Sequence, residues 1–216
     1  MAQLFSPSAN IWLPALLAGF VVVLCVWAGV GYGLFESGWE TGEDRARTQP
    51  IPFSHAHHVG EVGLDCRYCH GSVEDSAFAG MPTSETCMHC HAELFADSPT
   101  LAPVRESFAQ DRPIRWNRVH DLPDFAYFDH SVHVHKGVGC ETCHGRVDRM
   151  ALIRVAVPLA MEWCVDCHED PAPRLRPPGE VFTMGWQPDG DPQALARSLA
   201  ETLDVDARRS CSGCHR

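Results

Sequence analysis

The segment from Phe53 to His70 reads FSHAHHVGEVGLDCRYCH, and it decides how the chain is organised. It recurs from Phe128 to His144 as FDHSVHVHKGVGCETCH, with the same Phe-x-His-x-x-His start and the same Cys-x-x-Cys-His end. A second Cys-x-x-Cys-His follows each copy after a proline-containing stretch. Internal duplication is the economical explanation of such a match in register. We therefore predict two repeats followed by a separate C-terminal segment.

Ten of the eleven cysteines fall in five copies of Cys-x-x-Cys-His, which we number sites 1 to 5 in chain order. This is the attachment pattern of c-type haem, in which the two thiols form thioethers and the histidine is the proximal iron ligand. Zinc sites and disulfides are the alternatives, but a zinc site does not need a histidine directly after each cysteine pair. The predicted cofactors are five covalently bound haem c groups. The thioether residues are Cys66, Cys69, Cys87, Cys90, Cys140, Cys143, Cys164, Cys167, Cys211 and Cys214, and the proximal ligands are His70, His91, His144, His168 and His215.

Five haem groups would share the roughly 180 residues of the cysteine-rich part, which is too few for a separate apolar core around each. We expect the haem groups themselves to form the core. The predicted fold is mainly helical and irregular, with little or no sheet, and is of the multihaem cytochrome c type with repeats like those of cytochromes c7 and c3. Near the C-terminus, Asp191 and Pro192 begin a predicted helix whose leucines recur every four residues.

An uncharged run from Ile11 to Phe35 precedes this part of the chain. Its 25 residues are enough for one helix to cross a bilayer core of about 30 Å. Trp12 and Trp39 lie near its two ends, where interfacial aromatic residues are expected. A cleaved signal peptide is the alternative, but the run is long for one and no basic segment precedes it. We predict a retained transmembrane anchor.

The side of the membrane follows from the cofactor, because bacteria attach c-type haem outside the cytoplasmic membrane. Glu36, Glu40, Glu43 and Asp44, just after the anchor, agree with a periplasmic location of the haem part. The protein is thus expected in the bacterial inner membrane, crossing it once. The predicted organisation is a cytoplasmic N-terminus at 1–10, the anchor at 11–35, a linker at 36–50 and a periplasmic pentahaem domain at 51–216, which contains dihaem repeats 53–91 and 128–168 and a haem segment at 169–216.

The two Phe-x-His-x-x-His segments supply candidates for the distal iron ligands. Histidines three residues apart share one side of a helical turn, yet diverge enough to reach two neighbouring irons. We predict His55, His58, His130 and His133 as distal ligands. Solvated loop histidines are the simpler alternative, but both pairs recur in register with the haem motifs.

Four distal histidines leave one of five irons without a second ligand. Met161, three residues before Cys164, is the preferred candidate for the fifth distal ligand, and His120 is the alternative. Methionine would raise the potential of that haem relative to haems with two histidines. Weaker candidates are Met81, Met150 and Met184.

An iron with two protein ligands has no open position, so this ligand set predicts electron relay without substrate binding. The net charge of −11 argues against a nucleic-acid binder. A free-standing multihaem quinol dehydrogenase is one rival, although the motifs lack the CHxM extension that accompanies its quinol-site haem. A multihaem reductase is another rival and would need one open iron, which the missing fifth ligand leaves possible.

Nearly the whole chain resembles the pentahaem cytochrome c subunit of alternative complex III, a bacterial quinol-oxidising complex. The resemblance rests on MAQLFSPSAN before one anchor helix, on PFSHAHHV, CRYCHGSVEDSAFAGMP and RWNRVHDLPDFAYFDHSVHVHKGVGCETCHG, on MEWCVDCH, and on the number of haem motifs. It implies a subunit that is not itself an enzyme. The subunit would carry electrons from an iron–sulfur subunit resembling molybdenum oxidoreductases towards a periplasmic cytochrome or a terminal oxidase. The implied partners also include polytopic quinol-binding subunits and a monohaem cytochrome c, and one methionine among otherwise bis-histidine haems fits Met161.

Overall fold

The computed structural model describes residues 5–215. The first four residues of the predicted cytoplasmic segment and Arg216 lie outside the described part. The chain divides into two compact units, Met1–Gly42 and Glu43–Arg216. The boundary falls inside the segment 36–50 that the sequence predicts as a linker.

The first unit contains one long helix, α1 (Ala9–Phe35), and one short helix, α2 (Gly38–Thr41). The 27 residues of α1 extend about 40 Å, more than the thickness of a bilayer core. The unit holds the one helix among the described residues that is long and apolar enough to cross a membrane, with a mean hydropathy of 2.4. Gly42, at a φ of +72°, ends α2 in the left-handed conformation that glycine adopts without strain.

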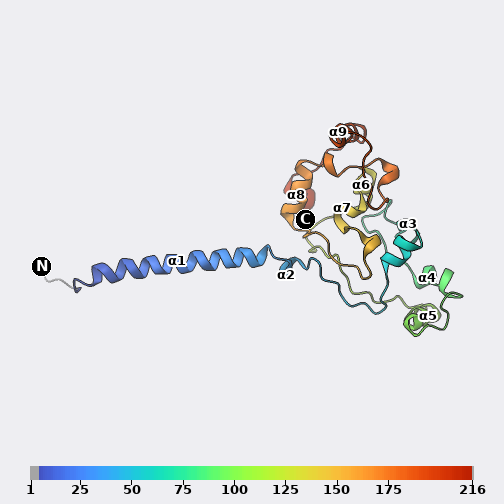
Figure 1. The fold of residues 1–216 in the computed structure, drawn as a ribbon, viewed down its shortest axis with the longest axis horizontal. Coiled ribbons are helices and arrows are strands. Elements are labelled where there is room, and N and C mark those ends of the chain that lie inside the picture. The colour runs from blue at the N-terminus through green and yellow to red at the C-terminus, as the bar shows by residue number, and fades with distance from the viewer. Residues whose placement is uncertain (1–4, 216) are drawn as a thin grey trace. The chain divides into compact units, whose positions relative to one another are not determined.

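The second unit consists of short helices joined by irregular segments (Figure 1). Across the residues that the structure describes, strand pairing is limited to isolated bridges, such as that between Glu43 and Val155. This confirms the predicted helical and irregular fold without a sheet. The elements are η1 (Ala56–Glu61), α3 (Cys66–Cys69), α4 (Ser84–His91), η2 (Pro99–Leu101), α5 (Ala102–Ala109), α6 (His130–His135), α7 (Cys140–His144), η3 (Val147–Arg149), α8 (Met161–Glu169), η4 (Ala172–Arg174), η5 (Pro178–Glu180), α9 (Pro192–Thr202) and α10 (Cys211–Cys214).

Each Cys-x-x-Cys pair lies on a helical turn, in α3, α4, α7, α8 and α10. Three residues of helix advance about 300° around the axis and 4.5 Å along it, which brings the two thiols to nearly the same side. The Asp65 side chain caps α3 by accepting a hydrogen bond of 2.8 Å from the backbone N–H of Arg67. The spacing of the two cysteines within one helical turn therefore accounts for the two-thiol arrangement at each site.

The two repeats differ by one residue, and the difference appears in the helix that carries the paired histidines. The stretch from Phe53 to Cys66 is one residue longer than the stretch from Phe128 to Cys140. In the longer copy η1 is a π-helix, whereas α6 in the shorter copy is an α-helix. A π turn takes one extra residue per hydrogen-bonded ring, so it absorbs the insertion.

Few apolar side chains are buried in the described chain. Val181 is the one large side chain with essentially no exposure, while aromatic side chains such as Phe78 and Phe95 are about 70% exposed. This is too little for an ordinary core of this length, as expected of a domain whose interior is built around haem. The buried apolar residues are Ile51, Val73, Val104, Met150, Val155, Leu175, Val181 and Leu199.

The C-terminal helix α9 forms as predicted, with Asp191 as its N-cap and Pro192 as its first residue. Leu199 is its buried residue. It packs against η4, and its end meets repeat 2, where the Lys136 ammonium donates hydrogen bonds of 2.8 and 2.7 Å to the carbonyls of Leu203 and Asp204.

Candidate haem sites

The proximal histidines are oriented by hydrogen bonds from Nδ1. At four sites this nitrogen lies within hydrogen-bonding distance of a backbone carbonyl: His70 to Gly80 (2.7 Å), His91 to Leu94 (3.0 Å), His168 to Arg208 (2.7 Å) and His215 to Phe125 (3.3 Å). A proton on Nδ1 leaves the lone pair on Nε2, the nitrogen that then binds a metal. At site 3 the partner is a side chain, because Nδ1 of His144 lies 3.3 Å from Nε2 of His120.

Three of the four predicted distal histidines also have Nδ1 next to a backbone carbonyl, and His55 is the exception. Nδ1 of His58 lies 2.9 Å from the carbonyl of Ser54, that of His130 lies 2.8 Å from Ala77, and that of His133 lies 2.7 Å from Asp129. Nδ1 of His55 is buried without a partner. Backbone carbonyls on three of these rings favour the tautomer with Nε2 free to bind iron.

A phenylalanine holds each pair of distal histidines in the same way in both repeats. The Phe53 ring stacks on His58, with centroids 4.3 Å apart and planes at 23°, and meets His55 edge-on at 4.9 Å. The Phe128 ring stacks on His133 at 4.4 Å and 25°, and meets His130 edge-on at 4.8 Å. The two sequence repeats thus share the same arrangement of one phenylalanine ring and two histidine rings.

The structure brings distal and proximal rings together in pairs. Ring centroids lie 6.1 Å apart for His58 and His91, 6.3 Å for His130 and His144, and 6.1 Å for His133 and His168. Two imidazoles that bind one metal ion from opposite sides, at about 2 Å each, have ring centres roughly 6 Å apart. The residues therefore fit a haem iron at sites 2, 3 and 4.

Site 1 follows the same scheme. His55 corresponds in the repeat to His130, and the nearness of His70 contributes to lowering its pKa. Burial is the larger cause, and together with His70 and His58 it brings the pKa of His55 to about 4. The pairing of His55 with His70 would give site 1 the arrangement that site 3 has.

Burial keeps other imidazoles neutral as well. It lowers the pKa of His144 to about 3, with His120 and His130 adding to the shift, and it lowers the pKa of His133 and of His120. A neutral imidazole is the form that binds iron.

Burial favours the protonated form of several cysteine thiols. Burial raises the pKa of Cys143 to about 12, and it raises the pKa of Cys69, Cys87, Cys164 and Cys167. Cys66 differs, because a hydrogen bond with the Cys140 thiol lowers its pKa to about 7. The thiols of sites 1 and 3 are therefore in direct contact.

The two candidates for the fifth distal ligand lie in different places. Met161 begins α8, one turn before Cys164, and its side chain is 70% exposed. His120 lies against His144 of site 3, with ring centroids 4.4 Å apart. Site 5 is held by residues 125–127, just before repeat 2. The backbone N–H of Tyr127 donates to the Cys214 carbonyl at 2.6 Å, and the Phe125 ring centroid lies 5.7 Å from that of His215.

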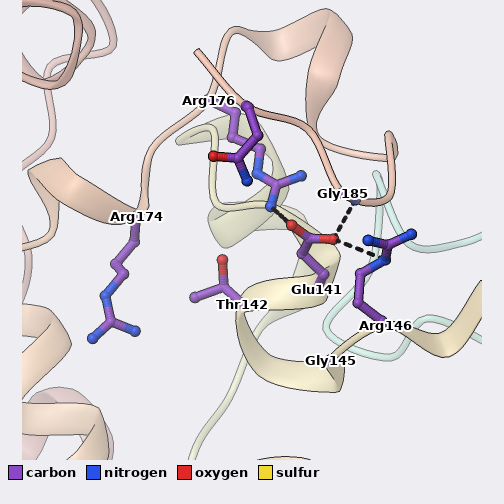
Figure 2. Close-up of a pocket in the computed structure, with 8 residues that line it drawn as sticks. Glu141, Thr142, Gly145, Arg146, Arg174, Arg176 and Gly185 are labelled. Carbon is purple, nitrogen blue, oxygen red and sulfur yellow. Dashed lines mark hydrogen bonds and ion pairs between the residues drawn. The ribbon is translucent and has the colours of Figure 1, made fainter. Parts of the chain in front are cut away.

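Sequence reasoning missed a segment that contacts two attachment motifs at once, residues 175–187, here called the strap. Arg176 in the strap is buried and forms an ion pair with Glu141 of site 3. Figure 2 shows the Glu141 carboxylate between Arg176 on one side and Arg146 with the backbone of Gly185 on the other. The Arg67 guanidinium of site 1 lies 4.5 Å above the Phe182 ring. A proline-rich stretch carries no motif, so only these contacts reveal the strap.

Residues 126–216 match the family model described as cytochrome c7 and related cytochrome c. The C-terminal part of the chain is therefore similar to the cytochromes of this family. The matched segment contains sites 3, 4 and 5, and the repeat extends the same motif pattern to sites 1 and 2.

A second similarity extends over a larger part of the chain. The chain is 33% identical over 127 residues to the "Menaquinone reductase, multiheme cytochrome c subunit" of Nitratidesulfovibrio vulgaris (strain Hildenborough). The match covers 58% of this chain and 54% of the relative, so the chain spans about half the length of the protein it matches.

Proposed function

We propose that this protein is a membrane-anchored pentahaem electron-relay subunit of a quinone-linked complex. The observation that carries the proposal is the pairing of imidazole rings at separations of 6.1–6.3 Å at sites 2, 3 and 4. An iron held between two such rings exchanges single electrons and has no position for a substrate. The chain's own contribution is then to orient ligands and to space the five groups.

The proposed ligand pairs are His55 with His70, His58 with His91, His130 with His144 and His133 with His168. For His215 we propose Met161. Two observations support Met161 over His120: His120 is already engaged with Nδ1 of His144, and Met161 lies on α8, which contacts the segment before site 5 through His168 and Arg208.

We further propose that the complex oxidises quinol, as the resemblance to the pentahaem subunit of alternative complex III implies. The partners would be an iron–sulfur subunit, polytopic quinol-binding subunits and a monohaem cytochrome. Helix α1 would anchor the chain in the inner membrane, with the haem domain in the periplasm. The long uncovered apolar surface of α1 supports an anchor that is surrounded by lipid or by partner helices.

The second candidate is electron flow in the opposite direction. It is favoured by the relative in Nitratidesulfovibrio vulgaris, which is named as a subunit of a menaquinone reductase. The same ligand pairs would serve both directions, because a six-coordinate haem is oxidised and reduced equally well. The direction depends on the partners and on the haem potentials.

The relay is tested by the optical spectrum of the dithionite-reduced holoprotein with and without carbon monoxide. Carbon monoxide binds ferrous haem only where an axial position is open or the ligand is easily displaced. We expect no spectral change, because each iron has two protein ligands. A spectral change equivalent to carbon monoxide binding at about one of the five haems would contradict a relay with no open iron and would favour a reductase.

The direction is tested on the native complex by rapid mixing. Quinol added to the oxidised complex should reduce the haems within the turnover time if the complex oxidises quinol. Oxidation of the pre-reduced haems by added menaquinone, without reduction by quinol, would instead support the menaquinone-reducing direction.

A further inference from the structure

We infer that the five haem sites form a single row in the order 2, 1, 3, 4, 5, so that sites 2 and 5 are the two ends of the relay. The inference rests on the proposed ligand pairs and adds the order of transfer to them. At each step a ferrous haem is oxidised to ferric while its ferric neighbour is reduced by one electron, and no atom or proton moves between them. In this row site 2 comes before site 1, which is the reverse of their order in the chain.

Sites 1 and 2 are neighbours because their attachment motifs touch. Tyr68 lies between the two cysteines of site 1, and His89 between those of site 2. The Tyr68 hydroxyl is 3.0 Å from Nδ1 of His89. The two distal histidines at η1 are proposed for this same pair of sites: His58 meets His91, and His55, the N-cap of η1, is the repeat counterpart of His130, which meets the proximal histidine of site 3.

Sites 1 and 3 are joined by the strap. The Cys140 backbone N–H donates to the carbonyl of Val181 at 3.1 Å, and the Cys66 thiol lies 4.0 Å from the carbonyl of the next residue, Phe182. Two consecutive strap residues therefore contact the first cysteine of each motif. Val181 lies at this junction and is the most deeply buried of the large side chains in the described part of the chain.

The strap is fixed firmly enough to set this spacing. The Arg176 backbone N–H donates to Gly137 at 2.7 Å, and its guanidinium donates to the carbonyl of Thr183 at 2.7 Å. A Cβ atom on Gly139 would overlap this guanidinium, so the glycine before Cys140 leaves room for it. Repeat 1 has Asp65 at the corresponding position before its first cysteine, and its carboxylate accepts hydrogen bonds of 2.8 Å from Arg67, whose guanidinium lies over Phe182 of the strap.

Sites 3 and 4 share helix α6. His130 faces His144 of site 3, and His133, one turn later, faces His168 of site 4. A single turn of helix therefore separates two ligands that belong to different irons. His55 and His58 at η1 have the same arrangement between sites 1 and 2.

Sites 4 and 5 meet through the segment that leads into the last motif. Nδ1 of His168 lies 2.7 Å from the carbonyl of Arg208, and the Arg208 side chain packs beside Gly213 between the cysteines of site 5. In Figure 1 the helices that carry sites 2, 1, 3 and 4 follow one another in this order across the second unit, from α4 through α3 and α7 to α8.

The order is tested by making one haem at a time reducible before the others. His55→Met and His58→Met replace the distal ligand of site 1 and of site 2, and methionine ligation raises the potential of that haem. The full-length holoprotein is poised so that the altered haem and the methionine-ligated haem of site 5 are ferrous and diamagnetic, and the unaltered protein with only site 5 ferrous is the reference. Electron paramagnetic resonance then shows how many of the remaining ferric haems have lost their magnetic coupling to the reduced haem. This number is the number of ferric neighbours of the reduced haem.

The order 2, 1, 3 predicts that reducing site 1 changes two ferric signals and that reducing site 2 changes one. The order of the chain predicts the reverse, and that result would overturn the inference. His133→Met at site 4 is the control and should change one signal, that of site 3, in either case, because site 5 is already ferrous.

A second measurement needs no substitution. In the unaltered reduced protein, magnetic resonance cross-relaxation should connect substituents of the haems at sites 1 and 3 and should not connect sites 2 and 3. A contact between sites 2 and 3 without one between sites 1 and 3 would overturn the order. Failure of the relay with no open iron is recognised separately, by a high-spin ferric signal or by carbon monoxide binding in the unaltered protein.

Discussion

At the scale of single residues, the site geometry depends on side chains that bind no iron. Phe53 and Phe128 each contact two distal histidines, one by stacking and one by an edge. Backbone carbonyls then hold the Nδ1 protons of most of the rings. The phenylalanines are positioning residues, since they limit how far the rings can rotate before Nε2 leaves the line to its partner ring.

Replacing Phe128 with leucine should change the haems of sites 3 and 4 and leave those of sites 1 and 2 unaltered. Leucine roughly preserves the volume, so we expect a loss of on the order of 1 kcal/mol in the free energy of unfolding. The low-spin ferric signals of the holoprotein report the change, and carbon monoxide binding should appear at two haems. Phe53→Leu should transfer the effect to sites 1 and 2, whereas Phe108→Leu, at a half-exposed position of α5, should alter neither pair. Equal effects of all three substitutions would contradict this role.

At the scale of elements, each repeat is built from one short helix that positions two distal histidines and two short helices with cysteine pairs. Helix α6 has only six residues and is capped by Asp129, whose carboxylate accepts hydrogen bonds from the backbone N–H groups of Ser131 and Val132. So short a helix is unstable by itself, and its cap and its packing decide whether it forms. The position of two ligands thus depends on one capping side chain.

Removal of the caps of α6 and α9 separates stability from ligand geometry. Asp129→Ala and Asp191→Ala should each cost about 1 kcal/mol in the free energy of unfolding, measured in guanidinium by circular dichroism. Because α6 carries His130 and His133, only Asp129→Ala should also shift the midpoint potentials of two haems. An equal shift in Asp191→Ala, or none in either variant, would contradict the dependence on α6.

At the scale of the whole molecule, the two units have different kinds of surface. The haem unit has its own buried residues, while α1 has none and exposes an unbroken apolar surface. Burial of about 20 such residues in lipid is strongly favourable, whereas their exposure to water is not. The division between Gly42 and Glu43 marks where an anchored and a water-exposed part would meet.

The anchor is tested by fractionation. The full chain should stay with the membranes after an alkaline carbonate wash, and a chain without residues 1–42, exported by an added signal sequence, should appear in the soluble fraction with its haem spectrum unchanged. Leu24→Arg should weaken insertion by about 3 kcal/mol, since a charge at the centre of a membrane helix is costly. Recovery of the full-length gene product as a soluble, N-terminally shortened protein would identify the segment as a signal peptide instead.

The sequence by itself determined the cofactor type and the duplication, and it predicted the ten attachment cysteines and the five proximal histidines, because a thioether site is complete within five consecutive residues. It also predicted the short helices and the C-terminal helix with its Asp191 cap, since capping and leucine spacing are local too. The four distal histidines could be proposed from their register in the repeat, but not assigned to individual irons.

Only the tertiary structure decided which rings face each other, because ligation is a contact through space between segments far apart in the chain. His133 and His168 are separated by 35 positions and still lie 6.1 Å apart. The π-helix of repeat 1, the engagement of His120 with His144 and the strap between sites 1 and 3 have the same origin. Each depends on packing between distant segments, and no local pattern of residues encodes such packing.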